Sequence, residues 1–194
     1  MANETPPASS LGRYRARLGR YVFDAAVLVV LLLLVAVFYL PRDSARALED
    51  LTRGLRGSSA AGMLLGYASA LVLVAAQAYT MVKRVGAPAI VRRLGGASLW
   101  LNIHIALSVI GLVAGLLHSG FPYRFRYEDF LSRGLGGLTT WLLILAAASG
   151  VFGRYLYRRL PAMRRAFRYW KPAHIVMTAL LLAVGLAHMT LTTL

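Results

Sequence analysis

The sequence predicts an all-α membrane protein built as a bundle of five transmembrane helices. Of its 194 residues, 58% are hydrophobic and only 15% are charged, whereas a soluble domain carries about 25% charged residues. Five apolar stretches each approach the length of about 20 residues that a helix needs to cross the hydrocarbon core of a bilayer. The chain has no cysteine, which excludes disulfides, Cys-ligated zinc, iron–sulfur clusters and covalently attached c-type haem.

The expected spans follow one another with short connections. They cover residues 21–40, 60–82, 98–118, 135–155 and 172–191. The first follows a basic segment, as a signal peptide would, but its apolar run is long for one, so we expect a retained helix. The connections have about 15 to 19 residues, too few for a soluble domain. We therefore expect a basic tail at 1–20 and one transmembrane domain at 21–194.

Lys and Arg residues are distributed unevenly between the two sides of the expected bundle. Segments 1–20, 83–97 and 154–171 hold fifteen of them, whereas segments 41–57 and 119–136 on the opposite side hold seven. Because cytoplasmic segments are enriched in basic residues, this predicts a cytoplasmic N-terminus and an outside C-terminus. The formal charge of +15 then reflects this bias and attraction to anionic lipid headgroups. We expect no nucleic-acid binding, since the arginines flank spans.

All four histidines of the chain fall within the third and fifth expected spans. His104 and His118 are fourteen positions apart in the third, and His174 and His188 are fourteen apart in the fifth. Ionisable residues inside spans are costly, so each marks a candidate functional site. Fourteen helical residues return the second side chain to within about 40° of the first, about 21 Å along the axis. Each helix therefore carries two histidines on one face, one near each membrane surface.

The two histidine helices are separated by one span, so they run parallel. This places His104 level with His174 near the cytoplasm, and His118 level with His188 near the outside. Facing imidazoles on two helices suit bis-histidine ligation of b-type haem, which needs no cysteine. We expect two haem b groups (iron protoporphyrin IX) with the four histidines as iron ligands. Hydrogen-bonded packing histidines are one alternative; a zinc or di-metal site is another, but its ligands would cluster at one point.

Glycines on the histidine-bearing faces belong to the predicted haem-binding set. Gly111 and Gly115 lie between the two histidines of the third span, and Gly185 lies in the fifth. Their missing side chains would leave room for the macrocycles. Plain helix packing is the alternative for Gly111-x-x-x-Gly115, and it is the expected role of Gly62-x-x-x-Gly66 in the second span.

Basic residues near the span ends are candidates to bind the anionic haem propionates. Arg154 and Tyr155 are the candidates for the cytoplasmic haem, and Arg124 and Arg126 for the outer haem, because arginine binds carboxylates well. The alternative is that these arginines only follow the charge bias and extend their head groups to the lipid surface.

The histidine pattern resembles the transmembrane haem core of the ferric reductase and NADPH oxidase superfamily, over about residues 58–191. In that group the ligand helices are also the third and fifth, with histidines about this far apart. The sequences GRYLY at 153–157 and WKP at 170–172 are similar to bacterial members, which implies the bacterial inner (plasma) membrane. The cytochrome b of quinol-oxidising complexes is a less close resemblance with near-identical histidine spacing.

The sequence departs from the reductase pattern in two ways. Five spans are expected where family members usually have six, and no G-x-G-x-x-G follows a strand, as a nicotinamide- or flavin-binding domain would require. If electrons come from a dinucleotide or an iron–sulfur protein, we expect that partner to be a separate chain.

The predicted function is transmembrane electron transfer through two haems, as a subunit or partner of a larger redox system. No catalytic residue is assigned, since Asp24 is the only carboxylate within the expected spans. A second hypothesis is an oxidoreductase subunit with a quinone, metal or oxygen site beside one haem. The aromatic-rich segment 119–136 would line it, and Glu128 or Asp129 could relay protons. A third is a non-haem membrane scaffold or transporter, which predicts a colourless protein.

Overall fold

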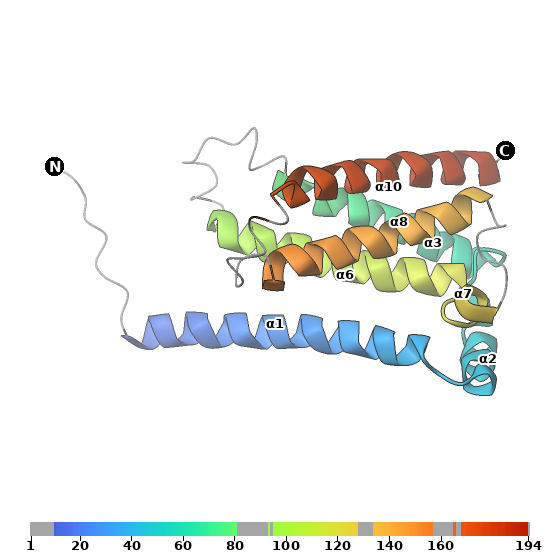
Figure 1. Ribbon diagram of the computed structural model, residues 1–194, viewed down its shortest axis with the longest axis horizontal. Coiled ribbons are helices and arrows are strands. Elements are labelled where there is room, and N and C mark those ends of the chain that lie inside the picture. The colour runs from blue at the N-terminus through green and yellow to red at the C-terminus, as the bar shows by residue number, and fades with distance from the viewer. Residues whose placement is uncertain are drawn as a thin grey trace. The chain divides into compact units, whose positions relative to one another are not determined.

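The computed structural model describes residues 10–80, 93, 95–127, 134–156, 165 and 168–193. Within these residues nearly all of the chain is helical and no strand occurs. The chain divides into two compact units, Met1–Leu40 and Pro41–Leu194. The elements of each unit are labelled in Figure 1. Segment 81–92, which holds much of one predicted basic loop, and segment 128–133, which includes Glu128 and Asp129, lie outside the described residues.

The first unit contains one long helix, α1 (Ser10–Phe38). Its apolar part, Leu18–Phe38, is long and apolar enough to cross a membrane and has the highest mean hydropathy of the candidate spans. The helix begins at Ser10, so residues 10–20 of the predicted tail are helical and continuous with the first span. The rest of that tail, 1–9, lies outside the described residues.

Four further helices of the second unit are long and apolar enough to cross a membrane. Their spans are Ala60–Thr80, Gly96–Ser119, Gly134–Leu156 and Trp170–Thr192. With α1 they make the five spans that the sequence predicts, with bounds that differ by a few residues at each end. Together they support the assignment to an integral membrane protein.

The helices of the second unit pack as two pairs. Helix α6 (Gly96–Ser119) packs along α3 (Ala60–Ala76), and α10 (Trp170–Thr193) packs along α8 (Gly134–Val151). Contacts between α6 and α8 join the pairs, whereas α6 and α10 pack far less extensively against each other. Figure 1 shows the four helices running along one another. The two histidine-bearing helices therefore each rest on a helix that carries no histidine.

Small and polar groups let the helices approach at the centre of the second unit. The Ser69 hydroxyl of α3 is buried and donates a hydrogen bond to the Gly111 carbonyl of α6, over 2.8 Å. Leu112 and Leu116 of α6 and Leu143 of α8 are also buried. Interhelical hydrogen bonds and small residues drive helix association where lipid removes the hydrophobic driving force.

The outward surface of the spans is strongly apolar. Among the exposed side chains are Leu32 of α1, Leu64 and Leu71 of α3, and Leu186 of α10, each with more than 60% of its surface accessible. In water this would be a large exposed apolar patch, which soluble monomers rarely carry. The surface instead matches the hydrocarbon core of a bilayer.

Short helices cover the end of α6 that carries His118. Helix α2 (Arg42–Leu51) and the single turn η1 (Arg53–Leu55) precede α3, and α7 (Tyr123–Tyr127) follows α6. Segment 41–57 is thus α-helical over its first part, Arg42–Leu51. Leu51 at the end of α2 is 84% exposed, which suits a helix lying at a membrane interface.

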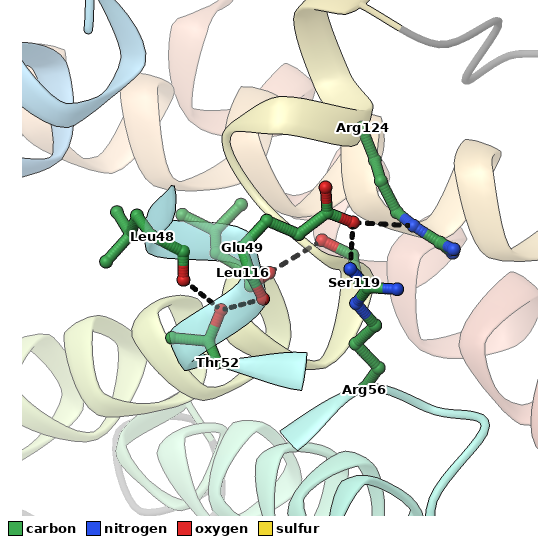
Figure 2. Close-up of polar contacts among 7 residues, drawn as sticks. All are labelled: Leu48, Glu49, Thr52, Arg56, Leu116, Ser119 and Arg124. Carbon is green, nitrogen blue, oxygen red and sulfur yellow. Dashed lines mark hydrogen bonds and ion pairs between the residues drawn. The ribbon is translucent and has the colours of Figure 1, made fainter. Parts of the chain in front are cut away.

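A buried carboxylate joins these short elements. Glu49 of α2 is only 5% exposed, and its Oε1 forms ion pairs with Arg56 and with Nε of Arg124, the latter at 3.2 Å. Figure 2 shows Glu49 directed between the two arginines. Thr52 donates its hydroxyl to the Leu48 carbonyl over 2.9 Å and ends α2 beside this cluster. The single carboxylate thus holds α2, the turn before α3 and α7 together.

We expect Glu49→Ala to destabilise the second unit strongly, because it leaves two largely buried guanidinium groups without their shared carboxylate. Breaking a buried pair costs about 3–5 kcal/mol, and the 27% exposure of the Arg124 side chain points to the lower end. Thermal unfolding in detergent measures the loss. The neighbouring Asp50 is exposed, so Asp50→Ala is the matched control and leaves the unfolding midpoint near wild type. Equal midpoints for the two variants would contradict a structural role for Glu49.

Candidate functional site

The four histidines form two pairs in the second unit. His174 of α10 lies near His104 of α6, and His188 lies near His118. This is the pairing expected if α6 and α10 run parallel. The pairs lie near opposite ends of the two helices, because the two histidines of each helix are fourteen residues apart. Each pair therefore brings together two imidazoles from helices that scarcely pack on each other.

Both histidines of α6 bond to main-chain carbonyls of α3. Nδ1 of His104 lies 2.8 Å from the Ala76 carbonyl oxygen, and Nδ1 of His118 lies 2.8 Å from the Gly62 carbonyl oxygen. A carbonyl oxygen can only accept, so Nδ1 carries the proton in each ring. Nε2 of each neutral imidazole then keeps its lone pair, as a metal-ligating histidine requires.

The two acceptor carbonyls belong to the last and first turns of α3. Ala76 is the last residue of α3, and the final carbonyls of a helix lack an intrahelical partner. Gly62 lies in the first turn, where its missing side chain lets the Arg56 main chain pack against the helix; a Cβ there would lie 1.5 Å from the Arg56 carbonyl oxygen. Each acceptor thus sits at one end of α3.

His174 bonds to a side chain on α8. Its Nδ1 lies 2.5 Å from Oγ of Ser149, and Ser149 donates its own hydroxyl proton to the Ala146 carbonyl over 2.8 Å. Because that proton is used, Ser149 Oγ accepts from His174, which again leaves Nε2 as the unprotonated nitrogen. Trp170 stacks on the His174 ring with 5.8 Å between ring centroids and an interplanar angle of 24°.

His188 lies against the main chain of α8. A Cβ on Gly136 would lie 3.1 Å from Cε1 of the His188 ring. Within the described part of the chain, no hydrogen bond to the ring nitrogens of His188 is seen. His188 is therefore positioned by close packing on a glycine, whereas each of the other three rings also has a hydrogen-bond acceptor.

The same fourteen-residue interval separates the contact residues on α3, α6, α8 and α10. The two acceptor carbonyls of α3 are fourteen residues apart, and so are Gly136 and Gly150 of α8, which face His188 and His174. Within each packed pair, the earlier histidine of one helix meets the later contact residue of the other, so the two helices are antiparallel. Equal spacing on antiparallel partners keeps both contacts of each pair in register over about 21 Å.

Three glycines leave space for histidine rings, and sequence reasoning assigned none of them to the site. A Cβ on Gly66 would lie 2.7 Å from Cε1 of His118, and one on Gly57 would lie 2.9 Å from the same atom. A Cβ on Gly136 would likewise lie close to the His188 ring, 3.1 Å from its Cε1. Gly66 had been expected only to pack helices. The fourteen-residue interval between Gly136 and Gly150, matching H-x13-H, was the signal in the sequence that could have identified the α8 glycines.

The glycines predicted to make room for macrocycles lie at helix contacts. A Cβ on Gly111 would meet the Leu73 side chain at 2.7 Å, and one on Gly115 would meet Leu143 at 2.7 Å. A Cβ on Gly185 would lie 3.6 Å from Cγ2 of Thr139 on α8. These contacts are those of the helix-packing alternative, and a role of these glycines toward haem stays a prediction.

The basic residues predicted to bind propionates divide between the two ends. Arg154 lies in the π-helical turn η3 (Phe152–Leu156) with Tyr155, and its Nη2 donates to Oδ1 of Asn102 over 3.3 Å. Asn102 precedes His104 by two residues, so Arg154 lies at the end of the bundle that holds the His104–His174 pair. Single π-helical turns often occur at functional sites.

At the other end, the two arginines of α7 have protein partners. Arg124 pairs with Glu49, and the guanidinium of Arg126 lies 5.1 Å from the centroid of the Tyr127 ring. Arg56, which was not among the predicted residues, directly precedes Gly57, whose amide donates to the His118 carbonyl over 3.2 Å. Binding of propionates by Arg124 and Arg126 stays a prediction.

The donor set fits haem better than a metal bound by protein alone. In the described segments no three His, Asp or Glu side chains gather as metal ligands. A haem iron needs only two protein ligands, one on each side. Three of the four rings have Nδ1 engaged by an acceptor, which leaves Nε2 for coordination. Each end of the bundle thus has two histidine rings that could supply the ligands of one haem.

Comparison with known proteins adds no further constraint: no protein-family model, no curated protein and no solved structure matches the chain.

We expect Gly66→Ala to push the His118 ring away from the Gly62 carbonyl, since the new methyl would lie 2.7 Å from Cε1. Overpacking of this kind costs about 1–3 kcal/mol. The thermal unfolding midpoint in detergent measures the effect. Gly54→Ala is the control, because a Cβ there meets nothing within 4 Å. A Gly66→Ala protein as stable as Gly54→Ala would show that the ring does not need this space.

Proposed function

We propose that the protein transfers electrons across a membrane through two b-type haems, each held by one pair of histidines. The observation that carries this proposal is the hydrogen bonding of the histidine rings. Both α6 histidines and His174 donate from Nδ1 to an acceptor on a neighbouring helix, which leaves Nε2 of each ring available as a ligand. A merely structural histidine inside a bundle has no need for a second histidine opposite it at the same depth.

His104 with His174, and His118 with His188, would hold the two irons. Haem supplies one-electron chemistry between ferrous and ferric iron. The chain's own residues would bind, orient and shield the haems. Helices α3 and α8 fix the rings by hydrogen bonds and close packing, while α6 and α10 have little direct packing against each other.

The proposal extends to the setting of the bundle. The distribution of Lys and Arg favours a cytoplasmic N-terminus and an outside C-terminus in a bacterial inner membrane. Redox proteins on one or both sides would deliver and accept electrons. The histidine pattern supports a relationship to the ferric reductase and NADPH oxidase haem core, and the cytochrome b of quinol-oxidising complexes is the alternative. Quinone, metal ions or oxygen are candidate reaction partners beside one haem.

The first test is the visible spectrum of the purified protein. We expect reduced b-type haem bands and two haems per chain by haem assay. His104→Ala and His174→Ala should each remove one haem, and the double variant His104→Ala/His174→Ala should lose no more than either alone, because the two residues hold the same iron. His118→Ala combined with His104→Ala should remove both.

Two outcomes would contradict the proposal, and a third would identify the reaction partner. A colourless wild-type protein with a normal helical circular dichroism spectrum favours the non-haem scaffold. Loss of both haems in the double variant of His104 and His174 would mean that the pairing is wrong. Haem reduction by a quinol in the isolated protein would favour the subunit with a quinone site.

A further inference from the structure

The four histidine rings do not have equivalent surroundings. His104 and His118 donate to main-chain carbonyls, and the His188 ring packs on Gly136. Among the described residues, His174 is the one whose ring is bonded to another residue's side chain, at Ser149. A side-chain acceptor can be removed by substitution, whereas a main-chain carbonyl cannot. Ser149 therefore gives the site a residue whose action on one ligand can be tested.

The hydrogen bonds around Ser149 leave it one role toward the ring. Its hydroxyl proton goes to the Ala146 carbonyl at 2.8 Å, and its own carbonyl accepts from Nε1 of Trp170 at 2.8 Å. The hydroxyl oxygen is thus an acceptor for Nδ1–H of His174 at 2.5 Å. The bond to Ala146 also fixes the direction in which Oγ presents its remaining lone pair.

Packing holds both partners of this bond in place. The Trp170 ring lies nearly parallel to the His174 ring, and a Cβ on Gly153 would overlap the Trp170 ring at 1.8 Å. A Cβ on Gly150 of α8 would lie 3.6 Å from Cε1 of His174. Ser149 and Gly150 of α8 and Gly153 of the π-helical turn η3 thus lie on one side of this helical segment, facing Trp170 and His174.

We propose that Ser149 is a positioning residue that sets the electron donation and orientation of His174 as an iron ligand, so that the haem held by His104 and His174 differs in potential from what histidine ligation alone would give. This inference rests on the proposed haem function. An acceptor on Nδ1–H makes the imidazole a stronger donor. A stronger donor stabilises ferric iron relative to ferrous iron and lowers the reduction potential.

The test is a spectroelectrochemical titration of the two haems in the purified full-length protein. In Ser149→Ala the acceptor is lost, so we expect one of the two haem transitions to shift to more positive potential while the other stays at its wild-type value. We also expect one of the two low-spin ferric signals to change its g values in the electron paramagnetic resonance spectrum. Haem content should remain two per chain.

Two further variants separate this role from a general disturbance of the bundle. Ser149→Thr keeps the hydroxyl, and threonine in a helix can bond the preceding turn in the same way, so both potentials should return to wild type. Ser108→Ala is the matched control. Ser108 is also a helical serine next to this pair, but it bonds the main-chain carbonyl of His104 at 2.7 Å, so its loss should shift neither potential.

The outcomes distinguish this inference from the proposed function. Two haems whose potentials do not move in Ser149→Ala overturn the role of Ser149 alone, as does an equal shift of both haems or an equal shift in Ser108→Ala. If Ser149→Ala loses a haem, the Ser149→Thr protein decides: wild-type potentials and g values support the inference, and a shifted potential overturns it. A wild-type protein without haem overturns the proposed function and this inference with it.

Discussion

An imidazole N–H inside a membrane is costly without an acceptor, and three of the four histidine rings of the second unit have one. Water is scarce in the hydrocarbon core, so an unsatisfied polar group costs several kcal/mol. Helix α3 meets the requirement with two main-chain carbonyls, and α8 meets it with a serine hydroxyl. The same bonds decide which ring nitrogen carries the proton and therefore which nitrogen can act as a ligand.

The four helices of the second unit have two different roles around the histidine rings. Helices α6 and α10 carry the histidines, and α3 and α8 carry what the histidines rest on, namely carbonyls, a hydroxyl and glycines. Each packed pair is antiparallel, so one fourteen-residue interval serves both contacts of a pair. The site is thus built from two similar helix pairs, which differ in the atoms that touch each ring.

The end of the bundle that holds His118 has an additional support. Glu49, Arg56 and Arg124 join α2, the turn before α3 and α7 through one buried carboxylate. Gly57 follows Arg56 directly and contacts the His118 ring, so the ion cluster fixes the main chain next to that ring. The end that holds His174 is supported differently, by Trp170, which stacks on that ring and packs against Gly153 of η3. The two histidine pairs therefore differ in their surroundings although each consists of two imidazoles.

Much of this could be predicted from local sequence. The five spans follow from apolar length, and the shared face of His104 and His118 follows from the helical period. The parallel direction of the third and fifth spans follows from counting, and the pairing of His104 with His174 agrees with it. The sequence did not identify Gly66 or Gly136 as neighbours of histidine rings, nor Glu49 as the partner of Arg124. The helical period determines the face on which a side chain lies, but the axial offset and rotation of one helix against the next depend on packing along their whole length. Those two quantities, decided only in the tertiary structure, bring a particular carbonyl, hydroxyl or glycine to a particular ring.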